Sequence, residues 1–200
     1  MKLFVNFLSC FRVLAAFAII PALLFQHYWC ALILFVLAAL SDWFDGFLAR
    51  KYDVCTKLGG VIDSTGDKLL VANTLIMLSV MMPVWFIVVP TVLLIARELY
   101  VSGLREFLGT QKMEMPVPNY RFAPGKIKAT LQMITISAFL ALFAFSSFIT
   151  PANISKTYLI IMNTLSQIGI IGIWASVAFS LWSATKYTIT FSEKIKKIKK

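Results

Sequence analysis

Four aspartates form two closely spaced pairs in an otherwise apolar part of the chain. Asp42 and Asp45 are three residues apart, and Asp63 and Asp67 are four apart, so each pair shares one face if its segment is helical. Together with Asp53 in the link between them, they are five of only nine acidic residues in the chain. Like charges at this density need compensation, which can come from paired cations, from protonation or from bound metal.

Divalent metal is the interpretation that best fits these residue types. Nearby cations such as Arg50 and Lys68 fall off the shared faces, so ion pairing alone is a weak solution. Oxygen ligands without His or Cys favour Mg²⁺ or Mn²⁺ over zinc, and such ions usually contact phosphate oxygens as well. The pattern therefore predicts two metal ions acting on a phosphate ester. Two alternatives stay open, namely ordinary acids at a membrane boundary, as expected for Asp53, and a path for transported cations.

The composition predicts that these acids lie at the ends of membrane-spanning helices. The chain is 60% hydrophobic and only 14% charged, and its mean hydropathy is +0.83. Its long apolar runs do not alternate as spanning strands would, and each is close to the length that a helix needs to cross a bilayer. We expect an all-α polytopic membrane protein, a single domain over residues 1–200. Its six transmembrane helices are expected at about 5–25, 29–50, 58–81, 84–107, 126–149 and 157–184.

The distribution of Lys and Arg predicts the orientation. Most cations fall at the N-terminus, in the links after the second and fourth runs, and in the lysine-rich tail over residues 193–200. The positive-inside rule then places both termini and the aspartates at the cytoplasmic face. The net charge of +10 is thus explained by membrane topology, and we expect no nucleic-acid partner. The tail is expected to contact anionic headgroups.

The acidic stretch follows one extended pattern: Asp42-x2-Asp45-Gly46-x2-Ala49-Arg50-x8-Gly59-x3-Asp63-x3-Asp67. This pattern resembles the signature of the CDP-alcohol phosphatidyltransferases, and every signature position is present. The resemblance implies a six-span membrane enzyme, usually dimeric, that moves a phosphatidyl group from a CDP-linked lipid to an alcohol and releases CMP. Family members often have Pro and Ala where this chain has Ser64 and Gly66, but Ser and Gly are small enough to preserve the helix face.

The resemblance also implies roles for single residues. Asp67 would be the general base that takes the proton of the acceptor hydroxyl, as well as a metal ligand. The metal-binding set would be Asp42, Asp45, Asp63 and Asp67, holding two Mg²⁺ or Mn²⁺ ions. The CDP-lipid would be contacted by Gly46, Ala49, Arg50, Thr56 and Gly59.

Three further segments resemble the bacterial phosphatidylglycerophosphate synthases: "NFLSCFRV" (6–13), "IARELYVSGLREFLG" (95–109) and "APGKIKATLQM" (123–133). The resemblance implies CDP-diacylglycerol and sn-glycerol 3-phosphate as substrates, membrane lipids as surroundings and the bacterial inner membrane as location. Arg97 and Arg105, eight residues apart, roughly share a helix face. With Lys126, Lys128 and Arg50 they could form a pocket for a doubly charged phosphate. The predicted clamp for the acceptor phosphate is Arg97, Arg105 and Lys126.

Alternatives to this acceptor are serine, an inositol phosphate or phosphatidylglycerol. A cation transporter is the alternative from another class, although its acids would be spread through the membrane depth. Glu98 and Glu106 are expected to orient the neighbouring cations or to cap exposed helix ends.

Overall fold

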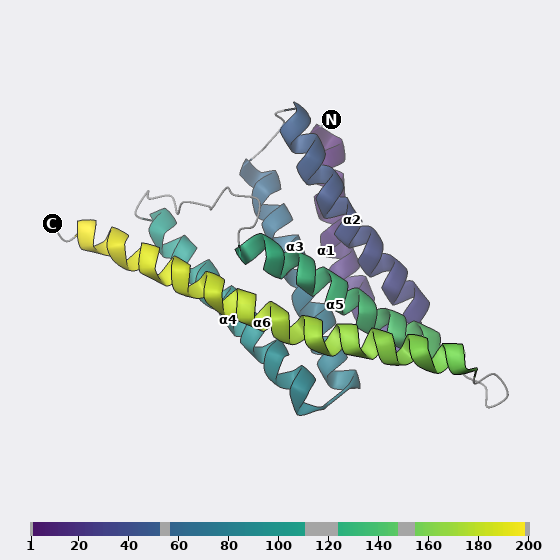
Figure 1. Cartoon of the computed structure of the whole chain (residues 1–200). Coiled ribbons are helices and arrows are strands. Elements are labelled where there is room, and N and C mark those ends of the chain that lie inside the picture. Colours follow the sequence, from purple (N-terminus) through teal and green to yellow (C-terminus); the bar gives the residue numbers. More distant parts are fainter. Residues whose placement is uncertain (1, 53–56, 111–123, 148–154, 199–200) are drawn as a thin grey trace.

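The protein is a chain of six helices, seen here in a computed structural model (Figure 1). The structure describes residues 2–52, 57–110, 124–147 and 155–198, with side chains described for 7–41, 62, 64–110, 125, 127–147 and 155–195. The all-α prediction is confirmed, because every regular element among the described residues is a helix. The helices are α1 (Lys2–Leu24), α2 (Tyr28–Tyr52), α3 (Lys57–Met81), α4 (Trp85–Thr110), α5 (Pro124–Ser146) and α6 (Lys156–Ile198).

Two tight turns connect the first four helices in pairs. The α1–α2 turn begins at Gln26, whose φ of 61° is left-handed and ends the helix. The α3–α4 turn contains Pro83, as predicted, and Val84 N donates to Met82 O at 2.8 Å. Such short links make the joined helices neighbours that run in opposite directions.

This up-and-down path brings alternate helix ends to the same side of the molecule. In Figure 1 the start of α3 lies near the end of α2, and the α1–α2 and α3–α4 turns lie on the opposite, lower side. The first end of α5 and the last ends of α4 and α6 also point towards the upper left. The ends that carry the predicted aspartates and most of the predicted cytoplasmic cations are therefore on one side.

Close packing between helix pairs depends on small residues. Gly66 of α3 is buried against α1, where an added Cβ would lie 3.3 Å from Val13 Cγ2. On α6, a Cβ at Gly169 would lie 2.7 Å from the Phe139 ring of α5, and one at Gly172 would collide with the Thr135 side chain. Small residues allow helix backbones to approach in this way where the solvent is lipid.

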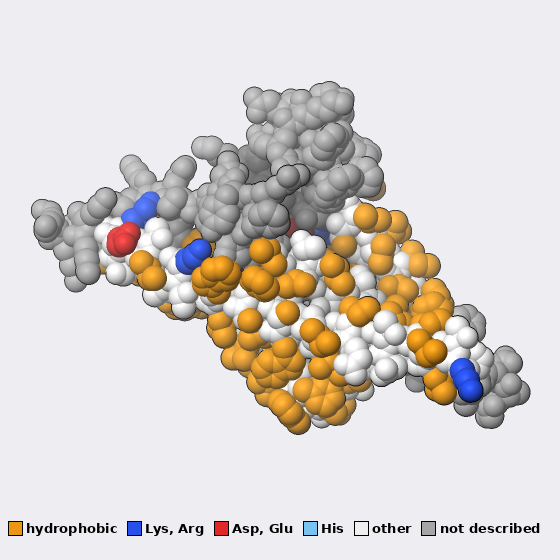
Figure 2. All heavy atoms as spheres, in the orientation of Figure 1, with side chains coloured by type: hydrophobic (Ala, Val, Ile, Leu, Met, Phe, Trp, Pro, Cys, Tyr) orange, Lys and Arg blue, Asp and Glu red, His pale blue; other side chains and the backbone are white. Residues whose placement is uncertain are grey.

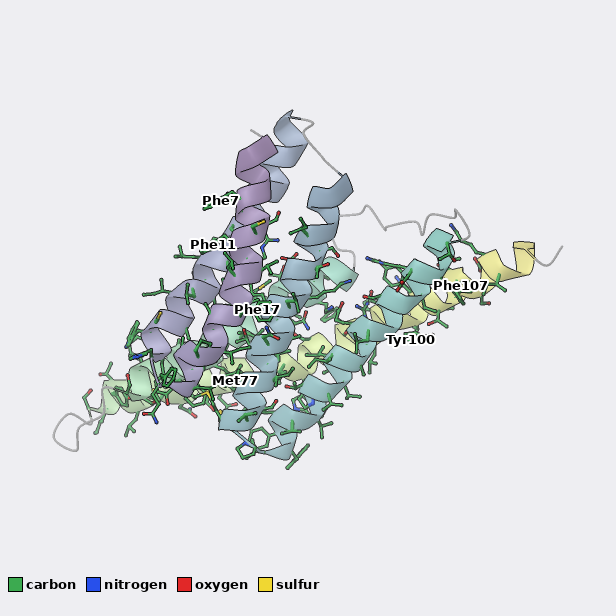
Figure 3. All side chains as sticks on the ribbon, turned by 180° about the vertical axis from the view of Figure 1, so that it is seen from behind. Phe7, Phe11, Phe17, Met77, Tyr100 and Phe107 are labelled. Carbon is green, nitrogen blue, oxygen red and sulfur yellow. The ribbon has the colours of Figure 1, made fainter. Side chains whose placement is uncertain are left out.

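Large apolar side chains cover the outside. Phe7 and Phe17 of α1, labelled in Figure 3, are 67% and 55% exposed, and hydrophobic atoms dominate the lower face in Figure 2. An apolar exterior of this extent belongs to a protein in contact with lipid. Four helices of the described part, α1, α4, α5 and α6, are long and apolar enough to cross a membrane. The count of six spans stays a prediction.

The last helix is longer than expected. The sequence predicted a span ending near residue 184, whereas α6 has 43 residues and ends at Ile198. At 1.5 Å per residue it is about 65 Å long. The extension packs on α4: the rings of Phe107 and Phe191 are 5.7 Å apart, and Tyr100 and Thr188 share a hydrogen bond of 3.1 Å.

Candidate functional site

The predicted metal-binding residues lie on two neighbouring helices. Asp42 and Asp45 belong to α2, Asp63 and Asp67 belong to α3, and the two helices are in contact. The helical backbone therefore gives each pair the shared face that its spacing predicted. Most of the predicted site lies outside the described side chains: Asp42, Asp45, Gly46, Ala49, Arg50, Thr56, Gly59, Asp63 and Lys126. Their roles stay predictions.

Asp67 is the predicted catalytic residue whose side chain the structure describes. Its Oδ1 accepts a hydrogen bond from Arg12 Nη1 of α1 at 2.7 Å. The Arg12 side chain is fully buried, whereas 34% of the Asp67 side chain is exposed. The arginine thus orients the carboxylate from the protein side, while the other side of Asp67 borders a cavity.

This cavity has a volume of about 370 Å³ and lies between α3, α4 and α5. Charged and polar residues line one part of it, and aliphatic residues line the rest. An amphiphilic ligand, with a charged head and an apolar body, matches this division. The lining residues are Ser64, Thr65, Asp67, Lys68, Leu69, Val71, Ala72, Leu75, Leu94, Ile95, Glu98, Leu99, Ser102, Lys128, Ala129, Gln132 and Met133.

Four cations gather beside this cavity. Lys68, Arg97, Arg105 and Lys128 come from three helices and are close enough to repel one another electrostatically. Glu98 contacts two of them, Arg97 and Lys128, which confirms the expectation that this glutamate orients the cations. Among the described side chains the four cations outnumber the two acids that act on them, Glu98 and Asp67, so the cluster is suited to an anionic ligand such as a phosphate.

Arg97 is buried and holds α4 to α6. Its Nε donates to Ser180 O at 3.1 Å, and its Nη2 donates to Ser183 Oγ at 2.9 Å. Its Nη1 lies 3.0 Å from Glu98 Oε1. Each terminal nitrogen therefore already has a protein partner, which gives this arginine a structural role whether or not it also contacts an acceptor phosphate.

Arg105 lies on the same side of α4 but is exposed. Its Nη2 donates to the Tyr187 hydroxyl at 2.6 Å, and its guanidinium carbon is 4.9 Å from the centre of the same ring. Arg97 and Arg105 both contact α6, so they lie on one face of α4, and their spacing of eight residues predicted this shared face. Because Arg105 is exposed, its guanidinium is the more accessible of the two to a phosphate.

Sequence reasoning did not assign a role at the site to Lys68 or Gln132, which the structure places at the cavity. Lys68 donates to Ser102 Oγ at 2.9 Å, and Gln132 lines the cavity one turn beyond Lys128 on α5. Lys128, predicted as one of the cations that could form the phosphate pocket, pairs with Glu98. Sequence reasoning also missed Arg12 as the partner of Asp67. The available signal was polarity, because a charged or amide side chain within an apolar run generally faces a protein interior or a site.

Comparison with known proteins assigns this arrangement to a family. The family model described as CDP-alcohol phosphatidyltransferase matches residues 2–182. A CDP-diacylglycerol--glycerol-3-phosphate 3-phosphatidyltransferase of Sodalis glossinidius is 31% identical over 185 residues, which are 91% of each chain. Proteins of the same name from Blochmanniella floridana and Rickettsia bellii are 28% identical over 190 residues and 46% identical over 105. The alignment with the Blochmanniella protein covers 93% of this chain and 89% of the relative. The alignment with the Rickettsia protein covers 52% of this chain and 55% of the relative.

Proposed function

Because the chain belongs to the CDP-alcohol phosphatidyltransferase family, we propose that it transfers the phosphatidyl group of CDP-diacylglycerol to sn-glycerol 3-phosphate. The products are phosphatidylglycerophosphate, a precursor of phosphatidylglycerol and cardiolipin, and CMP. Relatives named for this reaction align with nearly the whole chain. The observation that carries the choice of acceptor is the group of four cations beside the cavity, since glycerol 3-phosphate brings a phosphate and serine does not.

The chemistry is a displacement at phosphorus. A hydroxyl oxygen of the acceptor forms a bond to the phosphorus of the phosphatidyl group, and the bond from that phosphorus to the CMP oxygen breaks. Asp67 takes the hydroxyl proton, because an alcohol is a poor nucleophile until it is deprotonated. Arg12 Nη1 contacts Asp67 Oδ1 at 2.7 Å from the buried side, whereas Asp67 borders the cavity on its other side. The orientation of the carboxylate towards the cavity therefore does not depend on the substrate.

The donor set fits a divalent metal. Asp67 offers hard carboxylate oxygens at the cavity, and the helical spacing of Asp42, Asp45 and Asp63 supplies three more carboxylates on adjoining helix ends. Two Mg²⁺ or Mn²⁺ ions, when bound, would neutralise the pyrophosphate and stabilise the leaving group. The CDP part would contact Gly46, Ala49, Arg50, Thr56 and Gly59 on the same segment.

The acceptor phosphate would be held by exposed Arg105 together with Lys126. Arg97 supports this region chiefly through α6, and Lys68 and Lys128 add positive charge at the cavity. The apolar part of the cavity suits the body of a lipid that enters from the bilayer.

The enzyme would lie in the bacterial cytoplasmic membrane with its site and both termini facing the cytoplasm. The positive-inside pattern supports this orientation, and the helix ends that carry most of the predicted cytoplasmic cations share one side of the molecule. We also propose that it acts as a homodimer, as its resemblance to the family implies.

The test is CMP release by purified protein supplied with CDP-diacylglycerol, Mg²⁺ or Mn²⁺, and a panel of acceptors. We expect release with glycerol 3-phosphate and none with Asp67→Asn, which should still bind the CDP-lipid. Absence of release with every acceptor would overturn the proposed reaction, and release with serine alone would overturn only the acceptor.

A second measurement tests the phosphate clamp. Arg105→Ala should raise the KM for glycerol 3-phosphate about tenfold or more, the effect of losing one charged hydrogen bond. The KM for CDP-diacylglycerol should change far less. The opposite pattern would remove Arg105 from the acceptor site.

A further inference from the structure

Gln132 is a buried amide whose donor nitrogen has no hydrogen-bond partner in the described part of the chain. Only 5% of the residue is exposed, and its Nε2 atom has no partner among the residues that the structure describes. Buried side-chain amides are nearly always hydrogen-bonded, because their desolvation is otherwise uncompensated. We therefore expect the buried Gln132 amide to donate its hydrogen bond to a group other than the described residues.

The position of Gln132 separates it from other buried polar atoms of the same kind. Thr91 Oγ1, Thr135 Oγ1 and Ser180 Oγ also lack partners within the described part of the chain. Those three hydroxyl groups do not line the cavity of about 370 Å³, whereas Gln132 does. A ligand in this cavity can reach the glutamine but not the other three.

Gln132 lies at the boundary between the two parts of the cavity. On α5 it follows Lys128 by one helical turn, which places it about 6 Å further from the charged end. Next to it in the lining is Met133, and the aliphatic part continues with Leu75 of α3 and Leu94 of α4. The amide is thus beyond the groups that would hold a phosphate and before those that would contact hydrocarbon.

We propose that the Gln132 side chain donates a hydrogen bond to an uncharged oxygen on the glycerol unit of a substrate and so positions that substrate. This inference rests on the proposed function. Both substrates contain a glycerol unit next to a phosphate: the lipid offers ester carbonyl oxygens, and the acceptor offers hydroxyl oxygens. A neutral donor suits either one, because a cation at this depth would have no charge to balance.

The test is steady-state kinetics of the full-length enzyme in detergent–lipid micelles, comparing wild type with Gln132→Leu. Loss of one neutral hydrogen bond should raise the KM of one substrate about three- to tenfold and leave the KM of the other substrate unchanged. A rise for CDP-diacylglycerol identifies the ester oxygen, and a rise for glycerol 3-phosphate identifies the hydroxyl. Unchanged KM values for both substrates would overturn the proposal.

Thr91→Val is the matched control. It removes a buried hydroxyl that likewise has no partner among the described residues and does not line the cavity. We expect its KM values to equal those of wild type. If Thr91→Val shifts them as much as Gln132→Leu does, the effect is a general one of repacking and the proposal fails. Gln132→Met, which keeps an unbranched side chain of similar size, replaces Gln132→Leu if that variant does not fold.

Thermal unfolding gives an answer that does not depend on turnover. Without substrate, Gln132→Leu should unfold at the same or a higher temperature than wild type, because it removes an uncompensated buried amide. The increase in unfolding temperature on adding CDP-diacylglycerol or glycerol 3-phosphate should be smaller in the variant for one of the two. An inactive wild type would refute the proposed reaction, whereas equal ligand-induced shifts in both proteins would refute the role of Gln132.

Discussion

The contact between Arg12 and Asp67 gives a prediction whose size follows from the burial of each partner. Arg12 Nη1 and Asp67 Oδ1 are 2.7 Å apart, the arginine side chain is fully buried and 34% of the aspartate side chain is exposed. Removing either residue breaks the same contact. The two losses should nevertheless differ, because water can reach the carboxylate but not the guanidinium.

Asp67→Asn removes the carboxylate charge that the fully buried guanidinium of Arg12 contacts at 2.7 Å. Losing one partner of a buried pair costs about 3–5 kcal/mol, and the asparagine oxygen can still accept a hydrogen bond, so we expect a loss of about 2–3 kcal/mol. Arg12→Leu leaves a carboxylate that water can solvate, and we expect a loss of about 1–2 kcal/mol. The double variant removes both charges and should be about as stable as Arg12→Leu alone. The coupling free energy then equals the loss for Asp67→Asn, about 2–3 kcal/mol in magnitude.

The assay is the free energy of unfolding in mixed micelles, followed by far-UV circular dichroism. EDTA is present throughout, so that no divalent ion replaces the lost charge. Arg12→Leu combined with Tyr100→Phe is the control, because Tyr100 makes an exposed contact with Thr188 elsewhere in the molecule. This control pair should be additive. If Arg12→Leu and Asp67→Asn are also additive within about 0.5 kcal/mol, the two residues do not form a buried pair and the reasoning is refuted.

Three other outcomes are expected. Gly172→Ala should destabilise the protein by about 1–3 kcal/mol, because the added Cβ would collide with the Thr135 side chain. Gly103→Ala should be neutral or stabilising by up to about 1 kcal/mol, since nothing lies within 4 Å of the added atom. Equal unfolding temperatures of the two variants would contradict this packing. Arg97→Met should lower the free energy of unfolding by about 2–3 kcal/mol, because it removes the hydrogen bonds from Arg97 to Ser180 and Ser183 of α6. Arg105→Ala should lower it by about 1 kcal/mol or less, since that arginine is exposed. EDTA should abolish CMP release and added Mg²⁺ or Mn²⁺ should restore it, so activity that survives chelation would argue against the metal centre.

Much of the helical framework could be predicted from the sequence because it depends on local patterns. Apolar length and the sites of charge and proline determine where helices begin and end, and the predicted starts differ from the observed ones by only a few residues. The spacing of Asp63 and Asp67 likewise determines that they share a face once α3 forms. The continuation of α6 beyond the predicted span was not predicted, because residues beyond 184 are polar yet gain packing on α4 through Tyr187 and Phe191.

The partners of the site residues were decided by the tertiary structure alone. Arg12 and Asp67 are 55 positions apart, and Arg97 and Ser183 are 86 apart. No local pattern indicates such pairs, because helices that are apolar on nearly every side do not reveal which face turns inward. Close approach at Gly66 determines that face for α1 and α3, and with it the residue that holds the carboxylate. The sequence by itself thus determined the chemistry available to this protein, and packing determined which side chains could act together.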